Sequence, residues 1–233
     1  MKVAIMQPYF FPYIGYFQLL NTVDEFIVYD NIEYSKKGWI SRNRILVNGK
    51  DAYISVPIRK DSDFLDVRDR FLAQVWVTDR KKMLNRINES YRKAPEFEFV
   101  FAVVEKCILF EEPNLFKFIL HSLETLKSYL SITTPLSVSS TIAIDHSLKA
   151  EQKVLALCKE RNATHYINPI GGLQLYDKTI FKNQGIELSF LQSSELIYDQ
   201  LGNTFVPWLS IIDVMMFNSR EKIGVLLKNF ELK

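Results

Sequence analysis

The first residues that could do chemistry follow an apolar run near the amino terminus. Val3–Met6 is short and apolar, as expected for a strand buried on both faces, and Gln7-Pro8 breaks it. An aromatic segment follows, and Pro12 stands where a helix can begin. Open α/β folds bind ligands between the carboxyl end of a strand and the next helix. We therefore expect a binding site in this loop, with contacts from Gln7, Tyr9, Tyr13, Gly15 and Tyr16.

Part of this segment, Tyr13-Ile14-Gly15-Tyr16, stands where nucleotidyl-transferring α/β proteins carry a His-x-Gly-His signature. In that signature the glycine lets a nucleotide base approach, and the histidines donate hydrogen bonds to phosphates. Tyrosine can donate one hydrogen bond but cannot supply an imidazolium charge. The similarity therefore favours nucleotide binding over adenylyl transfer. Aromatic packing of Tyr13 and Phe17 onto the sheet is the alternative, but a glycine inside a helix costs about 1 kcal/mol against alanine and needs another explanation.

A second group of candidates places four cations and an indole within nine residues, Lys36–Arg44. Arginine forks and lysine ammonium groups can clamp phosphates. A solvated charge run is the ordinary alternative, but such a run rarely needs the indole of Trp39 or the amide of Asn43. We expect phosphate binding here, with a diphosphate held by Lys37, Arg42 and Arg44.

The third candidate is the segment "HYINPIGG", which begins at His165 and runs from a predicted strand to a glycine pair. Glycines at the amino end of a helix let backbone N–H groups approach an anion, and the helix dipole adds to the attraction. In a parallel sheet this loop opens at the same edge as the loop after Val3–Met6. We expect Asn168, Gly171 and Gly172 to form an oxyanion or phosphate cradle, and Tyr176 to be among the binding residues.

Few side chains are available for general acid–base chemistry. Asp30 ends the second predicted strand and is the best-placed base, while His165 is a second candidate or a buried neutral histidine. His121 lies inside a predicted helix, and His146 follows Asp145 as a dyad or a helix cap. No Cys/His cluster has zinc-ligand spacing, and we expect no metal site.

A parallel sheet is needed to bring these loops together. Short apolar runs that alternate with helical patterns predict its strands at Val3–Met6, Glu25–Tyr29, Leu136–Ile144, Thr164–Ile167 and Ile186–Leu191. The first crossover helix is predicted at Tyr13–Asn21, and later ones at Ser147–Arg161, Gly172–Asn183 and Pro207–Lys228. The pattern predicts a single α/β domain over residues 1–233. Its fold is expected to be a doubly wound parallel five-stranded sheet of nucleotidyltransferase or Rossmann type.

Two insertions are expected within this sheet. Asn48-Gly49 separates two alternating segments, and this dipeptide is the strongest short-range hairpin signal because both positions tolerate positive φ. We place the hairpin at residues 44–58. A helical subdomain follows at residues 76–130, with helices predicted at Trp76–Arg92, Phe97–Phe110 and Asn114–Leu130.

Composition narrows the function classes. Apolar residues form 48% of the 233, which is enough for a sizeable core. A net charge of +2 is too balanced for a general nucleic-acid surface. Cys107 and Cys158 lie in apolar helical contexts, as reduced core thiols do. No apolar run approaches the roughly 20 residues of a membrane span, and we expect a soluble cytoplasmic protein without a signal peptide.

Six ordered blocks across nearly the whole chain resemble the WbqC-like family of bacterial proteins. They are "IMQPYFFPYIGYF", "VYDNIEYSKKGWISRNRI", "SYRKAPEF", "YINPIGGLQLYD", "GIELSF" and "FVPWLSIIDVMMFN". The family often occurs in gene clusters for O-antigen and other surface polysaccharides. The resemblance therefore implies a sugar-nucleotide context and acyl or aminoacyl transfer to an amino sugar. The chain departs from the family pattern at two places. Members commonly carry Asp-Asp-Val-Gln where this chain has Asp30–Glu33, and many carry a histidine in the helix that contains Met83.

The leading hypothesis is a transferase that forms an amide on a nucleotide-linked amino sugar. Asp30 or His165 would take the proton from the amine, and Tyr9, Tyr13 and Trp39 would stack on the base or sugar. A coenzyme A thioester is the simplest acyl donor, whereas ATP would serve an amide ligase. A non-catalytic sugar-nucleotide binding protein is the third alternative. The apolar segment "LSIIDVMMF" packs on the domain or forms a homodimer, and the sequence does not separate these two outcomes.

Overall fold

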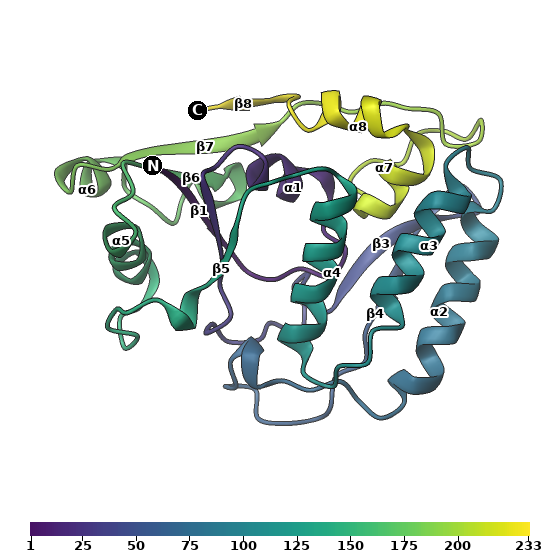
Figure 1. The fold of residues 1–233 in the computed structure, drawn as a ribbon, viewed down its shortest axis with the longest axis horizontal. Helices are drawn as coiled ribbons and strands as arrows, with labels where there is room; N and C mark the ends of the chain where they lie inside the picture. Colours follow the sequence, from purple (N-terminus) through teal and green to yellow (C-terminus); the bar gives the residue numbers. More distant parts are fainter.

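The computed structural model describes residues 1–233, and its central sheet has six strands (Figure 1). Their order is β5 (Leu136–Val138), β2 (Glu25–Val28), β1 (Lys2–Met6), β6 (His165–Pro169), β7 (Glu187–Ser193) and β8 (Phe230–Leu232). The first five are parallel, and β8 pairs antiparallel with β7. The prediction of a mostly parallel sheet is confirmed. The prediction of five strands was wrong, because the chain returns to the sheet edge with a three-residue strand too short to show a pattern.

The strand order reverses between β1 and β6. The chain runs outward from β1 through β2 to β5, then crosses to the other side of β1 to form β6 and β7. Because these strands are parallel, their carboxyl ends meet at one edge of the sheet. The loops that leave β1 and β6 diverge at that edge, and open α/β sheets bind ligands in the resulting crevice.

Helices cover both faces of the sheet. Along β1, Val3 and Ile5 pack into a core with α5 (Ala150–Glu160) and α6 (Lys178–Asn183). Ala4, between them, belongs to a larger core on the opposite face, since successive side chains of a strand point to opposite faces. Burial on both sides explains why Val3, Ala4 and Ile5 of β1 are all apolar.

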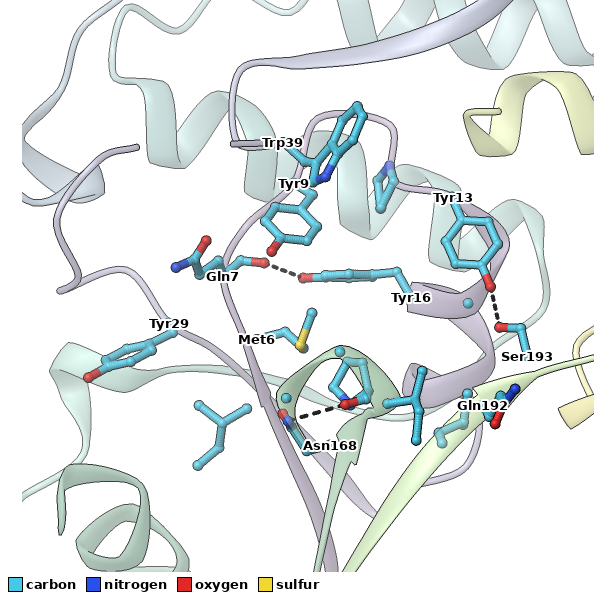
Figure 2. Close-up of a pocket in the computed structure, with 18 of the residues that line it drawn as sticks. Met6, Gln7, Tyr9, Tyr13, Tyr16, Tyr29, Trp39, Asn168, Gln192 and Ser193 are labelled. Atoms are coloured by element: carbon cyan, nitrogen blue, oxygen red, sulfur yellow. Dashed lines mark hydrogen bonds between the residues drawn. The ribbon is translucent and has the colours of Figure 1, made fainter. Parts of the chain in front are cut away.

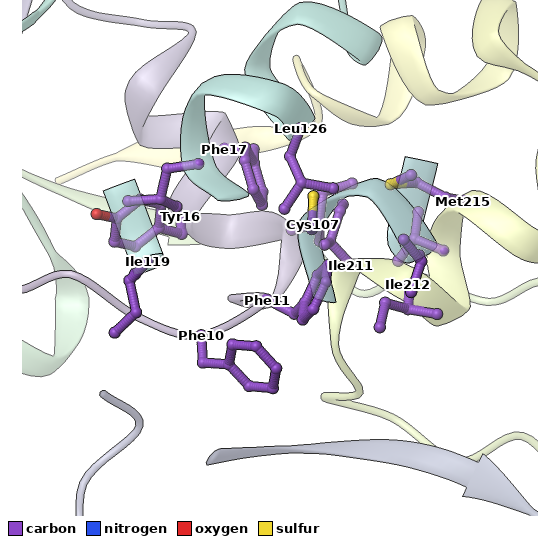
Figure 3. Close-up of a cluster of buried hydrophobic side chains, with 14 of the residues drawn as sticks. Phe10, Phe11, Tyr16, Phe17, Cys107, Ile119, Leu126, Ile211, Ile212 and Met215 are labelled. Carbon is purple, nitrogen blue, oxygen red and sulfur yellow. The ribbon is translucent and has the colours of Figure 1, made fainter. Parts of the chain in front are cut away.

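The larger core joins the amino-terminal loop to helices from much later in the chain. Phe10, Phe11 and Phe17 pack with Leu126 and Ile211, which come from α4 (Leu115–Tyr129) and α7 (Ile211–Phe217) (Figure 3). Helix α1 (Ile14–Leu20) is buried along its whole length in this core. The segment that carries the first candidate residues is therefore anchored by long-range packing.

The predicted hairpin is present and forms a two-stranded sheet of its own. Strands β3 (Arg42–Val47) and β4 (Lys50–Ser55) are antiparallel, and the turn has φ values of 51° at Asn48 and 73° at Gly49. Positive φ at both positions is the geometry that an Asn-Gly turn favours. The hairpin lies beside the aromatic loop, and this placement matters for the site below.

The three helices predicted in the middle of the chain are also present. They are α2 (Trp76–Tyr91), α3 (Phe97–Ile108) and α4, and the Asn114 side chain caps α4 by accepting a bond of 3.0 Å from Lys117 N. Helix α2 contacts α3 and β3, and α3 contacts α4 and α7. None of the helices has the length and apolar character needed to cross a membrane.

Several predicted boundaries were wrong, each for a local reason. Strand β5 ends at Val138 because residues 139–141 form a 3₁₀ turn. Helix α5 begins at Ala150 because the Ser147 hydroxyl bonds Asp145 (2.7 Å) instead of capping the helix. Helix α6 begins at Lys178, so the glycine pair lies in a 3₁₀ turn of its own. The predicted carboxyl-terminal helix is two helices, α7 and α8 (Arg220–Leu226).

Burial makes a measurable prediction for the two thiols. Cys107 and Cys158 are both buried and free, and burial raises the pKa of each thiol to about 12. Because the thiolate is the reactive form, the folded protein at pH 8 should hold roughly 1,000-fold less thiolate than the unfolded chain. A colorimetric thiol titration with and without denaturant measures this difference. Rapid labelling of both thiols without denaturant would contradict the packing of the two helices.

Candidate functional site

A cavity of about 670 Å³ opens at the carboxyl edge of the sheet, where the strand order reverses (Figure 2). The loops after β1 and β6 and the end of β7 form its walls. Its lining is rich in aromatic side chains, namely Tyr9, Tyr13, Tyr16, Tyr29, Trp39, Tyr176 and Trp208. The predicted residues that line it are Gln7, Tyr9, Tyr13, Gly15, Tyr16, Trp39, Asn43, Arg44, Asn168, Gly171, Gly172 and Tyr176. The other four, Asp30, Lys37, Arg42 and His165, lie outside it.

The hairpin holds the aromatic loop in place. Asn43, which is buried, donates hydrogen bonds to the carbonyls of Phe10 (3.1 Å) and Phe11 (2.8 Å). The rings of Phe10 and Phe11 are fully buried, and Tyr9 and Tyr13 on either side of them line the cavity. The two phenylalanines therefore anchor the loop, while the tyrosines form part of the cavity wall.

The absence of a side chain at Gly15 makes room for the ring of Tyr13. A β-carbon at this position would stand 2.3 Å from Cε1 of Tyr13, whose ring lies over the glycine. We had expected the glycine to admit a nucleotide base, but in this structure the ring of Tyr13 fills the space. Desolvation by burial raises the pKa of Tyr13, and its hydroxyl donates to Ser193.

Tyr16 stands where the nucleotidyl signature carries its second histidine, and its hydroxyl is also hydrogen-bonded within the protein. Tyr16 is buried, and its hydroxyl donates to the main-chain carbonyl of Gln7 (3.1 Å). The hydroxyl of Tyr16 is thus engaged by the β1 loop, as Figure 2 shows. The Gln7 side-chain amide makes no hydrogen bond within the protein and is free to meet a ligand.

The turn after β6 packs tightly around Asn168. A β-carbon at Gly172 would stand 1.8 Å from Nδ2 of Asn168, so only glycine fits there. The Tyr166 hydroxyl donates to Oδ1 of Asn168 at 3.1 Å, and Asn168 is buried. Gly171 has open space around it and faces the cavity. Because this turn does not begin α6, the expected contribution of a helix dipole is absent.

Only one of the predicted phosphate-binding cations reaches the cavity. Arg42 donates to the carbonyls of Gly38 (3.1 Å) and Lys37 (2.5 Å), and its guanidinium lies 4.9 Å from the Tyr53 ring centroid. The Lys37 side chain is exposed to solvent. The predicted clamp of three cations therefore reduces to Arg44.

Arg44 is the only charged side chain that lines the cavity. Its guanidinium pairs with Asp51 at 3.1 Å, donates to the Trp208 carbonyl at 3.2 Å and lies 5.7 Å from the Trp39 ring centroid. Its Nε atom is buried without a hydrogen-bond partner. Arg44 is thus held in place by the surrounding groups and retains donor capacity.

Asp30 lies at the carboxyl end of β2, but its carboxylate is hydrogen-bonded within the protein. It is 2% exposed and accepts hydrogen bonds from the Ser139 hydroxyl (2.8 Å), the Ser140 N–H (2.9 Å) and the Ser140 hydroxyl (2.6 Å). These bonds secure the turn that ends β5. Both oxygens are occupied, and we leave Asp30 out of the mechanism proposed below.

His165 lies at the wrong end of its strand. It begins β6, whereas the cavity meets the other end at Pro169, roughly 13 Å away at about 3.3 Å per residue. Its Nε2 bonds the Ser189 hydroxyl at 2.9 Å, and burial lowers the pKa of the imidazole. No histidine, cysteine or carboxylate lines the cavity.

Twelve of the 24 lining residues were not predicted from the sequence, and the polar or aromatic ones among them are Tyr29, Gln192, Ser193 and Trp208. Tyr29, Gln192 and Ser193 stand at the carboxyl ends of β2 and β7, and the same edge rule could have found them. Trp208 is 58% exposed, has a φ of 61° and packs 5.4 Å from the Tyr13 ring. A bulky residue held at positive φ is an outlier that accumulates at functional sites. Burial raises the pKa of Tyr29 to about 12.

The fold and cavity define an α/β protein with a cavity of aromatic lining at the reversal of its strand order. The chain belongs to the WbqC-like protein family, whose model matches residues 7–225. It is 30% identical over 221 residues to the uncharacterized protein Rv1507c of Mycobacterium tuberculosis, with 93% of each chain covered. No solved structure matches the chain.

Proposed function

We propose that the cavity binds a nucleotide-linked amino sugar and that the protein transfers an acyl or aminoacyl group to the sugar amine. The family context of surface polysaccharides such as O-antigen supplies the substrate class. The observation that carries the proposal is the aromatic cavity at the strand-order reversal, with Arg44 as its one charged lining group. A volume of about 670 Å³ lies within the range of small-molecule sites.

The lining suits the parts of such a ligand. Aromatic faces stack on bases and on the apolar faces of sugars, and a guanidinium binds phosphate oxygens through two parallel hydrogen bonds. Tyr9 and Trp39 offer such faces on the cavity wall, and the Trp39 ring centroid lies 5.7 Å from the Arg44 guanidinium, while the free amide of Gln7 and the turn at Gly171 offer polar contacts. Arg44 would hold the diphosphate.

The chemistry needs no carboxylate base if the amine is bound without its proton. Burial in a largely apolar cavity that no carboxylate lines lowers the pKa of a bound amine, because desolvation disfavours the ammonium form. The neutral nitrogen attacks the carbonyl carbon of a thioester. The N–C bond forms, the C–S bond breaks, and the nitrogen's proton leaves with the thiolate as a thiol.

A specific observation favours one alternative, a sugar-nucleotide binding protein without turnover. No side chain with a carboxylate, imidazole or thiol lines the cavity, and most transferases use at least one such group. The ATP-dependent ligase is less well supported, since the two positions of the nucleotidyl signature hold tyrosines whose hydroxyls bond Ser193 and Gln7.

Calorimetry followed by mass spectrometry tests the proposal. UDP- and dTDP-linked amino sugars should bind, and addition of an acyl-coenzyme A should yield an N-acylated sugar with release of coenzyme A. Asp30→Asn is expected to leave the binding constant unchanged, because Asp30 lies outside the cavity. Binding with no product would support the non-catalytic alternative, and no binding of either ligand would overturn the proposed site.

A further inference from the structure

A chain of partly buried hydrogen bonds starts at Gln18 and ends at the cavity wall. The Gln18 side chain is fully buried in α1, and its Nε2 donates to the carbonyls of Leu226 (2.8 Å) and Asn229 (3.0 Å). Both partners are acceptors only, so the amide nitrogen must face them. The amide oxygen of Gln18 therefore faces the other way, toward Ser193.

The direction of the remaining bonds follows from the proton count. Ser193 donates its hydroxyl proton to Oε1 of Gln18 at 2.6 Å. A hydroxyl has one proton, so Ser193 meets Tyr13 as an acceptor, and the Tyr13 hydroxyl donates to it (Figure 2). The proton of Tyr13 is thus committed to the protein. The Tyr13 oxygen can therefore only accept a hydrogen bond from a ligand, through its remaining lone pair.

Tyr13 is also held in this position by its neighbours. Its ring lies over Gly15, where any larger residue would collide with it, and packs against Trp208 at 5.4 Å between centroids. Both Tyr13 and Ser193 line the cavity. The acceptor is therefore preorganised before a ligand enters.

We propose that Tyr13 determines specificity by accepting a hydrogen bond from the neutral amine of the bound sugar. This inference rests on the proposed function and adds a named contact to it. An amine or hydroxyl can donate to the lone pair of Tyr13, whereas a keto group at the same carbon would bring two acceptors together. A buried pair of unsatisfied acceptors costs enough to lower affinity about tenfold or more.

The test compares two UDP-linked sugars that differ only in an amino or a keto group at the same carbon. The wild-type protein should bind the amino sugar at least about tenfold more tightly. In Ser193→Ala the Tyr13 hydroxyl is free to turn and donate to the keto oxygen, so the two dissociation constants should converge. Ser194→Ala is the matched control, since this neighbouring serine does not line the cavity and its side chain takes no part in the chain of bonds.

The outcomes separate this inference from the function on which it rests. Convergence in Ser193→Ala with an unchanged preference in Ser194→Ala supports the role of Tyr13. Equal binding of both sugars by the wild type, or an unchanged preference in Ser193→Ala, overturns the role of Tyr13 and leaves the cavity as a sugar-nucleotide site. Failure of both sugars to bind the wild type overturns the proposed function and this inference with it.

Discussion

Replacing Arg44 with glutamine is expected to weaken binding of a nucleotide-linked sugar roughly 10- to 100-fold. Arg44 is the only charged residue on the cavity wall, and hydrogen bonds to charged groups contribute about 1.5–3 kcal/mol each. Calorimetric titration at two ionic strengths measures the loss. The salt dependence of binding should also fall, because the contact removed is ionic.

The chain provides a matched control two residues away on the same strand. Arg42→Gln makes the same change in a guanidinium that bonds the Lys37 and Gly38 carbonyls outside the cavity. Its dissociation constant should stay within about twofold of the wild type. Arg44→Lys keeps the charge but loses the planar fork, and an intermediate affinity is expected. Equal losses in the two glutamine variants would mean that the cluster acts as a whole and that Arg44 has no special role.

Removal of the Asp213 carboxylate is expected to cost roughly 3 kcal/mol or more of folding free energy. Asp213 is fully buried and accepts hydrogen bonds from the hydroxyls of Tyr91 (2.8 Å) and Tyr198 (2.7 Å) and from Gln200 Nε2 (2.7 Å). Asp213→Ala leaves these three buried donors without their acceptor, and each unsatisfied group costs about 1–3 kcal/mol. For a domain with a stability of about 5–15 kcal/mol, that is a large fraction.

Urea denaturation of Asp213→Ala and Asp199→Ala measures the difference. Asp199 lies in the loop before α7 and is exposed, and it accepts one hydrogen bond, from the Gly202 N–H (2.8 Å), so its variant should lose no more than about 1 kcal/mol. Asp213 secures the segment that leads to Trp208, because Gln200 bonds both the N–H and the carbonyl of Val206. A loss below about 1 kcal/mol in Asp213→Ala would show that the network contributes little.

Much of the architecture could be predicted from local patterns. The hairpin turn at Asn48-Gly49, the cap at Asn114 and the buried strand at Val3–Met6 each depend on a few neighbouring residues, and each is present in the structure. The position of the cavity followed from one general rule, that parallel strands end at a common edge. The same rule did not anticipate β8, which is a short edge strand that depends on where the chain returns.

The assignment of individual side chains was harder. Arg42 and Arg44 are alike in type and two residues apart on one strand, yet only Arg44 meets the cavity. Asp30 has the position of a catalytic base, but serines 109 and 110 residues later in the chain occupy its oxygens. Trp208 falls inside the predicted helix Pro207–Lys228, but the structure begins α7 at Ile211 and leaves Trp208 in the preceding loop, where it lines the cavity. Each outcome depends on partners distant in sequence.

By itself, the sequence determined the class of fold, the family and the edge of the sheet at which the cavity opens. These follow from short-range patterns, since apolar runs, turn dipeptides and loop composition depend on neighbouring residues. Only the tertiary structure decided which side chains face the cavity and which hydrogen-bond role each retains. Tyr13 illustrates the reason, because its role is set by Ser193, Gln18 and two carbonyls near the carboxyl terminus. A hydroxyl becomes a donor or an acceptor through the groups that packing brings to it.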